Sequence, residues 1–112
     1  MRQTMTSKKM NFKVIVASVA LLGAIGPAYA NLAMAQKNAC MACHAVDKKL
    51  VGPAYQAVVE KYAKENDYGA KLAASIKAGG SGKYGPIPMP AQAALSDADA
   101  LTLAKWVLAG AK

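Results

Sequence analysis

The chain has 112 residues, so it holds at most one small domain, which excludes a multidomain enzyme. Its apolar fraction of 54% excludes a disordered chain. Lysine and arginine number 14 against 6 acidic residues, which gives a net charge of +8. Several of the basic residues lie close to the N-terminus, ahead of an apolar run.

The first 30 residues have the three parts of a secretory signal peptide. A basic segment precedes the uninterrupted run 14–25 of apolar or small residues, and an A-x-A cleavage site follows at 28–30. The apolar run is shorter than the roughly 20 residues that a membrane-spanning helix needs. The alternative is an uncleaved anchor, but a glycine, a proline and an asparagine interrupt it before Ala35. We therefore expect export, with cleavage after Ala30.

The expected mature domain, residues 31–112, has ten lysines, six acidic residues and no arginine. Without arginine or a long lysine cluster, nothing in it favours recognition of nucleic acid. Twenty of its residues are alanine, so its side chains supply little bulk for a core. Small domains often recruit disulfides, a metal or a partner, and its two cysteines are too close together to join distant elements. A bound cofactor is the natural candidate.

Four segments of the mature domain have helical patterns, and none has the pattern of a convincing strand. The first, rich in alanine, covers residues 32–42 and leads into the cysteines. The second begins at Tyr55, where apolar residues recur at the spacing of one helical face. The third covers about residues 69–78, and the fourth covers residues 96–110 and begins close to a capping box. The predicted fold class is all-α, with about four helices.

A loop, residues 79–95, separates the last two predicted helices. Three prolines within residues 86–90 exclude a helix or a central strand there. A long loop in so small a domain usually has a function. Since the prolines lower the conformational entropy of the unfolded segment, the loop can hold Met89 in one place at reduced cost.

The sequence Cys-Met-Ala-Cys-His at residues 40–44 carries the chemistry. On a helix these cysteines and the histidine share one face, so both thiols and the imidazole point toward the same object. A haem matches that object, because Cys40 and Cys43 can form thioethers with its vinyl groups and His44 can bind its iron. A thioredoxin-like redox pair would need strands, and a zinc site would need further histidines or cysteines, so both alternatives fit less well.

A haem iron bound by His44 takes a second axial ligand or keeps an open position. Of the methionines left after processing, Met34 and Met41 are too close to the attachment sequence to reach the opposite haem face. Met89 follows His44 by 45 residues and can reach it. Ligation by both residues leaves no position for substrate and raises the potential, which favours electron transfer. The alternative is a haem-bound subunit of a larger complex, or a cytochrome that binds small ligands when its methionine is labile.

These features resemble the small bacterial class I cytochromes c, and in particular the cytochrome c-551 type. The resemblance covers essentially the whole mature domain and rests on residues 40–44, 51–55, 85–90 and 101–108. It implies a small all-α cytochrome c fold, in which about four helices wrap around one covalently attached haem c. It also implies covalent attachment at Cys40 and Cys43, with His44 and Met89 as the axial ligands of the iron.

The resemblance further implies which residues surround the haem. The carbonyl of Pro53 is expected to accept a hydrogen bond from the outer nitrogen of His44 and so to orient the ring. Ile87 and Trp106 are expected in the haem pocket, with Trp106 packing against the first helix. The chain departs from many relatives at Tyr84, where they carry tryptophan, so a donor to a haem propionate is replaced by a phenol or lost.

The implied function is one-electron transfer in the periplasm, between respiratory complexes and terminal reductases or oxidases. The expected partners are a quinol-oxidising complex, a nitrite reductase, a peroxidase or a terminal oxidase, and the sequence does not choose among them. Scattered lysines are candidates for a positive rim that steers docking, namely Lys37, Lys48, Lys49 and Lys83. The alternative for each of them is that it only keeps the protein soluble. We expect a monomer without stable membrane insertion, and transient interfaces below about 1,200 Å².

Overall fold

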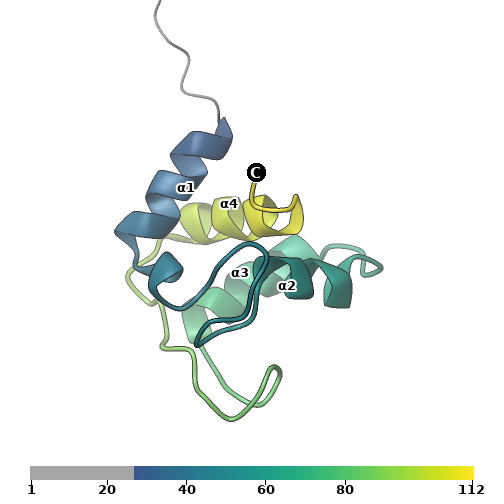
Figure 1. Ribbon diagram of the computed structural model, residues 1–112. Helices are drawn as coiled ribbons and strands as arrows, with labels where there is room; N and C mark the ends of the chain where they lie inside the picture. The colour runs from purple at the N-terminus through teal and green to yellow at the C-terminus, as the bar shows by residue number, and fades with distance from the viewer. Residues whose placement is uncertain (1–26) are drawn as a thin grey trace, which may run out of the picture.

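The computed structural model describes residues 27–112, so most of the predicted signal peptide lies outside the described residues. Its elements are α1 (Pro27–Lys37), a short 3-10 helix η1 (Cys40–Ala42), α2 (Tyr55–Tyr62), α3 (Tyr68–Ala78) and α4 (Asp97–Leu108), as Figure 1 shows. Within this range β-pairing is limited to two isolated bridges, His44–Lys49 and Gly80–Met89. The predicted all-α class with four α-helices is confirmed.

The first predicted helix differs from the observed one. We expected one helix over residues 32–42, but α1 begins at Pro27 and ends at Lys37. The helix ends because Ala39 adopts a left-handed conformation, with φ of 58°, and the side-chain amide of Asn38 donates to the Met34 carbonyl at 2.9 Å. The attachment sequence therefore starts a separate turn, η1, and the prediction that it continues the first helix is wrong.

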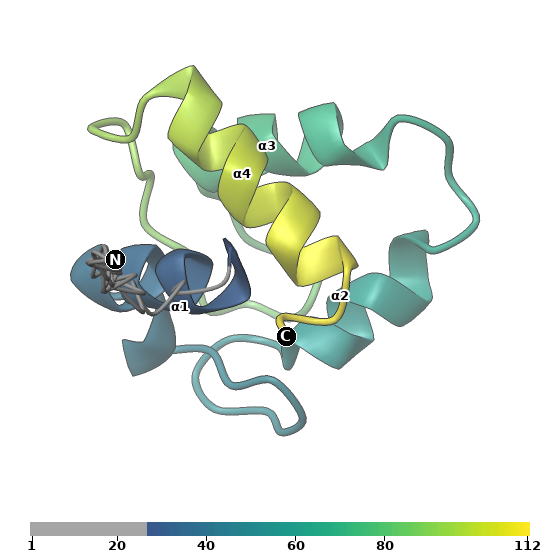
Figure 2. The same cartoon turned by 90° about the horizontal axis from the view of Figure 1, so that it is seen from above.

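Helix α4 lies at the centre of the fold and packs against each of the other α-helices, as the view from above in Figure 2 indicates. Its buried face repeats at the spacing of an amphipathic helix and consists of Ala100, Leu103, Ala104, Trp106 and Val107. Ala35 of α1 has no exposed surface and belongs to the same core cluster. Alanines at such positions let helices approach closely, and they leave much of the interior to be filled by larger groups from elsewhere.

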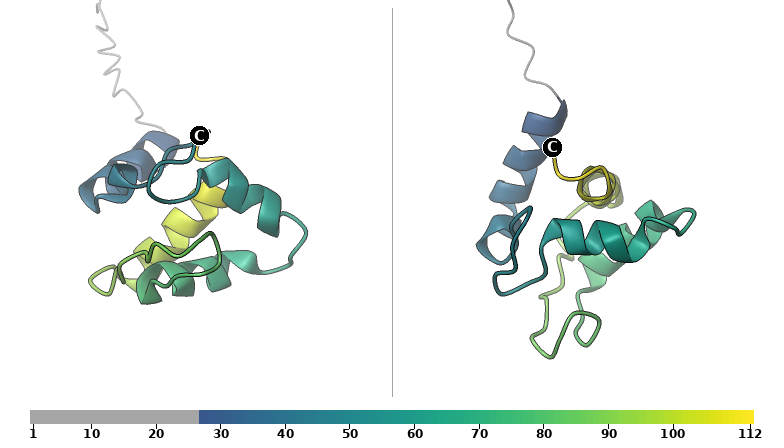
Figure 3. Two further views of the ribbon diagram at one scale, coloured as in Figure 1. Left: turned by 60° about the horizontal axis from the view of Figure 1, so that its bottom comes forward. Right: turned by 45° about the vertical axis from the view of Figure 1, so that its right-hand side comes forward.

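Residues 79–96 connect α3 to α4 and extend on the side of the molecule opposite the N-terminal end of α1, as Figures 1 and 3 show. This connection contains the three prolines and Met89. No helix within residues 27–112 is both long and apolar enough to cross a membrane.

The start of α4 matches the sequence prediction closely. The Ser96 hydroxyl accepts a hydrogen bond from the backbone amide of Asp99 at 3.0 Å, as an N-cap residue does. Asp97 and Asp99 lie in the first turn, where negative charge interacts favourably with the helix dipole. An ion pair between Lys77 and Asp97 connects the end of α3 to this turn.

We expect Ser96→Ala to lower the free energy of unfolding by about 1 kcal/mol, because one amide at the start of α4 loses its acceptor. Chemical denaturation followed by circular dichroism measures the change. Ser96→Asp supplies another good N-cap acceptor and should retain most of the stability. An equal loss in both variants would show that the cap is not the cause.

Candidate haem site

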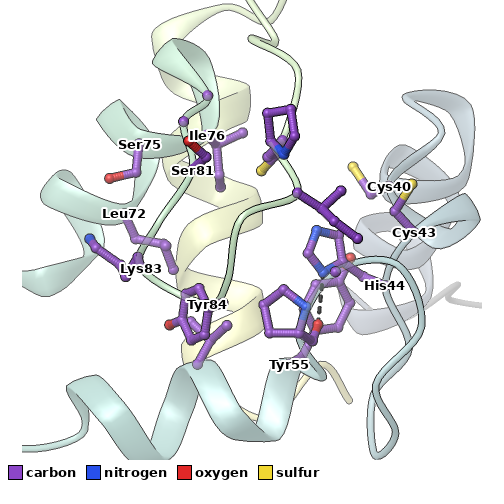
Figure 4. A pocket seen from close by; sticks show the side chains of 18 of the residues that line it. Cys40, Cys43, His44, Tyr55, Leu72, Ser75, Ile76, Ser81, Lys83 and Tyr84 are labelled. Carbon is purple, nitrogen blue, oxygen red and sulfur yellow. Dashed lines mark hydrogen bonds between the residues drawn. The ribbon is translucent and has the colours of Figure 1, made fainter.

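A cavity of about 350 Å³ lies between the attachment sequence, α2, α3, α4 and the proline-rich loop. In the close view of Figure 4, Cys40, Cys43 and His44 lie on one side of it. Lys83 and Tyr84 lie on the other side. All eight residues singled out from the sequence line this one cavity, namely Cys40, Cys43, His44, Pro53, Tyr84, Ile87, Met89 and Trp106. The fold thus brings together residues that are far apart in the sequence.

The turn at the attachment sequence orients both cysteines and the histidine. The backbone amides of Cys43 and His44 both donate to the carbonyl of Cys40, at 3.2 and 3.0 Å. We expected these i+3 and i+4 contacts within a regular helix, and the structure has them in a tight turn. The side chains of Cys40, Cys43 and His44 all line the cavity. Neither cysteine forms a disulfide, so both thiols are available for other bonds.

The thiol environment does not favour a zinc site. Burial raises the pKa of the Cys40 thiol, which disfavours the thiolate that zinc requires. Among residues 27–112, no cluster of three or more histidine, cysteine, aspartate or glutamate side chains is arranged to hold a metal ion.

The imidazole of His44 is held in position from two directions. Its Nδ1 atom lies 2.8 Å from the carbonyl oxygen of Pro53. Donation of the Nδ1 proton to this carbonyl leaves Nε2 with a lone pair that can bind a metal. Gly52 lies against the ring so closely that a Cβ atom there would be 2.5 Å from Cε1 of His44. The ring therefore has little freedom to tilt toward residue 52.

Tyr55 supports the imidazole as well. Its ring stacks on His44, with a centroid distance of 5.3 Å and an interplanar angle of 18°. Trp106 packs edge-on against Tyr55, at 5.7 Å between centroids, and the Tyr55 hydroxyl donates to the sulfur of Met41 at 3.6 Å. Burial raises the pKa of Tyr55, so the phenol keeps its proton. Trp106 thus supports the site through Tyr55, in addition to its place in the core.

Sequence reasoning assigned no role to Gly52 or Tyr55. Both lie in the segment 51–55, which was among the sequences that carried the resemblance. A glycine before a proline is typical of many turns, and an aromatic residue at the start of a helix is typical of a core position. Only the tertiary contacts show that both residues touch His44.

The backbone of Met89 is held by a pair of glycines at the end of α3. Met89 and Gly80 exchange two backbone hydrogen bonds, of 2.8 and 3.1 Å. Gly79 has a φ of +66°, and a Cβ atom there would lie 2.5 Å from the Met89 carbonyl oxygen. The glycine pair ends the helix, as its sequence indicates, and it also lets the proline-rich loop approach closely. This second property was not predicted.

Three buried donors in the cavity wall have no partner within residues 27–112. They are the hydroxyls of Tyr62 and Tyr84 and the indole nitrogen of Trp106. A buried polar group without a partner costs about 1–3 kcal/mol, so these groups suit a ligand that carries oxygen acceptors. A haem supplies carboxylate acceptors, an apolar ring for the apolar walls, and bonding positions for two thiols and an imidazole. The residues present therefore fit a haem.

Apolar side chains are exposed beside the cavity. Within residues 27–112 the exposed large apolar residues are Leu50, Val51 and Ile87, with exposed fractions of 42%, 53% and 61%. Val51 and Ile87 line the cavity, so Ile87 borders the predicted pocket while most of its surface faces outward. Exposed apolar residues at the edge of a cavity often mark a surface that binds another molecule.

Comparisons with known proteins agree with the haem interpretation. A sequence profile of the cytochrome c family matches residues 30–111. Cytochrome c-552 of Nitrosomonas europaea is 50% identical over 92 residues, which cover 82% of this chain and 88% of that protein. Cytochrome c-551 of Pseudomonas aeruginosa is 53% identical over 73 residues, which cover 65% of this chain and 69% of that protein.

Solved structures show the same relationship. The crystal structure of wild-type Nitrosomonas europaea cytochrome c552 has a TM-score of 0.68 and 48% identity, covering 72% of this chain and 99% of that chain. The crystal structure of the class 1 cytochrome MtoD from Sideroxydans lithotrophicus ES-1 has a TM-score of 0.63 and 31% identity, covering 74% and 95%.

We expect Gly52→Ala to lower the free energy of unfolding by roughly 1–3 kcal/mol, because the new methyl group overlaps the ring of His44. Gly69→Ala is the matched control, since a Cβ at this position of α3 would make only ordinary contacts, at 3.6 Å from Lys105 and 3.8 Å from Leu101 of α4. It should raise stability by about 0.5–1 kcal/mol, as alanine does in helices. Denaturant titrations of the purified protein measure both changes. Equal effects would contradict a close Gly52–His44 contact.

Proposed function

Since this chain belongs to the cytochrome c family, we propose that it is a periplasmic one-electron shuttle in which His44 and Met89 bind the haem iron. Proteins of this family are electron carriers rather than enzymes, and the cofactor is one covalently attached haem c per chain. The Cys40 and Cys43 pair fits that attachment. When bound, the haem supplies an iron that changes between ferrous and ferric states. The observation that carries the proposal is that both proposed ligands line one cavity, each with a fixed backbone.

The protein's contribution to electron transfer is to keep the two ligands in place. His44 is restrained by Pro53, Gly52 and Tyr55, and Met89 is restrained by its hydrogen bonds to Gly80. Ligands that stay in place need little rearrangement when an electron arrives or leaves. An uncharged thioether sulfur also raises the potential of a haem relative to most other ligands.

The walls of the cavity keep water away from the site. They include apolar side chains from α2, α3 and α4, namely Val58, Leu72, Ile76, Leu103 and Val107. A low-dielectric surrounding disfavours the more highly charged ferric state, which raises the potential further. A haem bound between these walls would supply the bulk that the alanine-rich helices lack.

We propose that partners dock over the exposed apolar residues beside the cavity. Leu50, Val51 and Ile87 provide an apolar centre, and Lys48 and Lys49 are exposed next to it in the sequence. An acidic surface on a redox partner would be steered toward these lysines, with Lys37 and Lys83 extending the positive rim. Such a contact suits a small, transient interface. The proposed partners are the quinol-oxidising complex, nitrite reductase, peroxidase and terminal oxidase classes.

The proposed export signal predicts the mass of the mature protein. The cleavage point after Ala30 falls within the first part of α1, so processing removes four described residues and keeps the fully buried Ala35. Mass spectrometry of protein from the periplasmic fraction should give a chain that begins at Asn31 and carries one covalent haem. A haem-bearing chain that retains residue 1 in the membrane fraction would contradict this prediction.

The ligand proposal predicts the properties of Met89→Ala. Its midpoint potential should fall by a substantial part of the roughly 0.8 V range that axial ligands control, because the thioether is lost. Its ferrous form should bind carbon monoxide readily, whereas the wild type should resist binding. Redox titration and visible spectra measure both effects. Met34→Leu is the control, since Met34 does not line the cavity. Unchanged spectra and potential in Met89→Ala would rule out Met89 as the ligand.

A further inference from the structure

The segment that carries Met89 lies on the C-terminal end of α3. Met89 and Gly80 exchange two backbone hydrogen bonds, of 2.8 and 3.1 Å, and the amide of Gln92 donates to the carbonyl of Ile76 at 3.2 Å. The last carbonyls of a helix have no partner within the helix, so the loop satisfies a group that α3 leaves open. We call Ile76, Gly79 and Gly80 the α3 seat. It holds the loop at Met89 and again three residues farther along.

Gly79 lies at the centre of the α3 seat, against the backbone of the loop. A Cβ atom there would lie 2.5 Å from the carbonyl oxygen of Met89, 2.7 Å from the nitrogen of Ala91 and 2.9 Å from the carbonyl carbon of Pro90. All three are backbone atoms, which cannot turn aside as the end of a flexible side chain can. A Cβ atom at Gly80 would have nothing within 4 Å among residues 27–112. The missing side chain at Gly79 therefore decides how closely the loop approaches α3.

The end of the helix does not by itself require this glycine. Helix α1 ends just ahead of an alanine, Ala39, which has a φ of 58° and a ψ of 18°. Gly79 has a φ of 66° and a ψ of −167°, a combination that glycine adopts almost exclusively. The next residue, Gly80, is the one that pairs with Met89. The conformation of Gly79 thus serves the contact with the loop as well as the end of α3.

The position of the Met89 sulfur depends on the backbone of the loop. A methionine side chain has three rotatable bonds and adapts easily, so it does not fix its own sulfur. Prolines at residues 88 and 90 restrict φ on both sides of Met89, so this segment moves as a stiff unit. A distance of 2.5 Å falls 0.5 Å short of the 3.0 Å that Cβ atoms keep from other heavy atoms. A side chain at Gly79 would therefore displace Met89 from its place over the cavity.

We propose that the α3 seat positions Met89 on the haem iron, and that Gly79 is the positioning residue that sets the strength of the iron–sulfur bond. The proposal rests on the ligation of the iron by Met89, as proposed above. A methionine ligand raises the potential of a haem and occupies the position that another ligand would take. A loop that lies farther from α3 weakens this bond, lowers the potential and makes the iron accessible to other ligands.

The test is Gly79→Ala in the exported, haem-loaded protein, with imidazole as the competing ligand of the ferric iron. Imidazole has to displace Met89, so its apparent dissociation constant reports the strength of the iron–sulfur bond. We expect this constant to fall by roughly 5–100-fold, because the new methyl group overlaps the backbone of the loop. The midpoint potential should fall as it does in Met89→Ala, but by less. Spectrophotometric and redox titrations measure the two effects.

Gly110→Ala is the matched control. Gly110 follows α4, has a φ of +99° and does not line the cavity, and a Cβ atom there would lie 3.9 Å from Cε of Lys112, an ordinary contact. The variant adds the same methyl group at another positive φ, so it should lower the stability and leave the imidazole affinity and the potential unchanged. If Gly79→Ala matches this control while Met89→Ala loses its spectral features, the α3 seat is overturned and the axial ligation stands. Unchanged spectra in Met89→Ala would overturn both proposals.

Hydrogen exchange of the wild-type protein tests the α3 seat without a substitution. Imidazole that displaces Met89 should also release the loop, so the amides of Gly80, Met89 and Gln92 should exchange faster in its presence. Amides within α4 are the internal reference and should keep their rates. If imidazole binds while those three amides exchange at unchanged rates, Met89 leaves the iron without leaving the α3 seat, and the proposal is wrong.

Discussion

The hydrogen bond between the imidazole of His44 and the carbonyl of Pro53 is the contact on which the rest of the site depends. It selects the tautomer that leaves Nε2 available, and it sets the plane of the ring. Gly52 and Tyr55 enclose that ring from the same short segment of chain. Tyr55 in turn packs against Trp106, so the position of the imidazole is tied to the central helix α4. Two aromatic contacts thus connect the proposed iron ligand to α4.

The composition of the chain explains why this arrangement is needed. Its helices bury alanines such as Ala35, Ala100 and Ala104, which allow close approach but contribute little apolar area. The larger side chains surround the cavity instead of filling the centre of the molecule. The covalently attached cofactor consequently belongs to the core, and the stability and redox chemistry of the protein depend on the same contacts.

The sequence predicted the elements whose signals are local. The cap at Ser96 and the periodic apolar face of α4 were confirmed because each depends on residues within a few positions. The end of α1 was predicted wrongly, because alanine favours a helix and the left-handed conformation of Ala39 depends on its surroundings. The role of the glycine pair beside Met89 was missed for a related reason. The sequence does not distinguish a glycine that ends a helix from one that lets another segment pack closely against it.

The residues of the candidate site also divide into those that have a local sequence signal and those that have none. The attachment sequence is recognisable from spacing alone, and so is a methionine braced by prolines. The contacts of Tyr62 with Tyr68 and Lys83 join segments that no local pattern connects. In the sequence, Tyr62, Tyr68 and Lys83 each have the pattern of an ordinary surface or core position. Only the fold places them beside one another.

The short bridge between Gly80 and Met89 has a consequence for the behaviour of the protein at high concentration. Two hydrogen bonds pair these segments in the manner of neighbouring strands, and such exposed pairs can recruit a further strand from another molecule. Here the residues on both sides of Met89 are prolines, which have no amide hydrogen to offer. Neighbouring residues of a strand direct their amides to opposite sides, so the missing amide hydrogens are those of the edge that faces away from Gly80. This edge therefore offers no donors to a further strand beside Met89, which protects the segment from edge-to-edge aggregation.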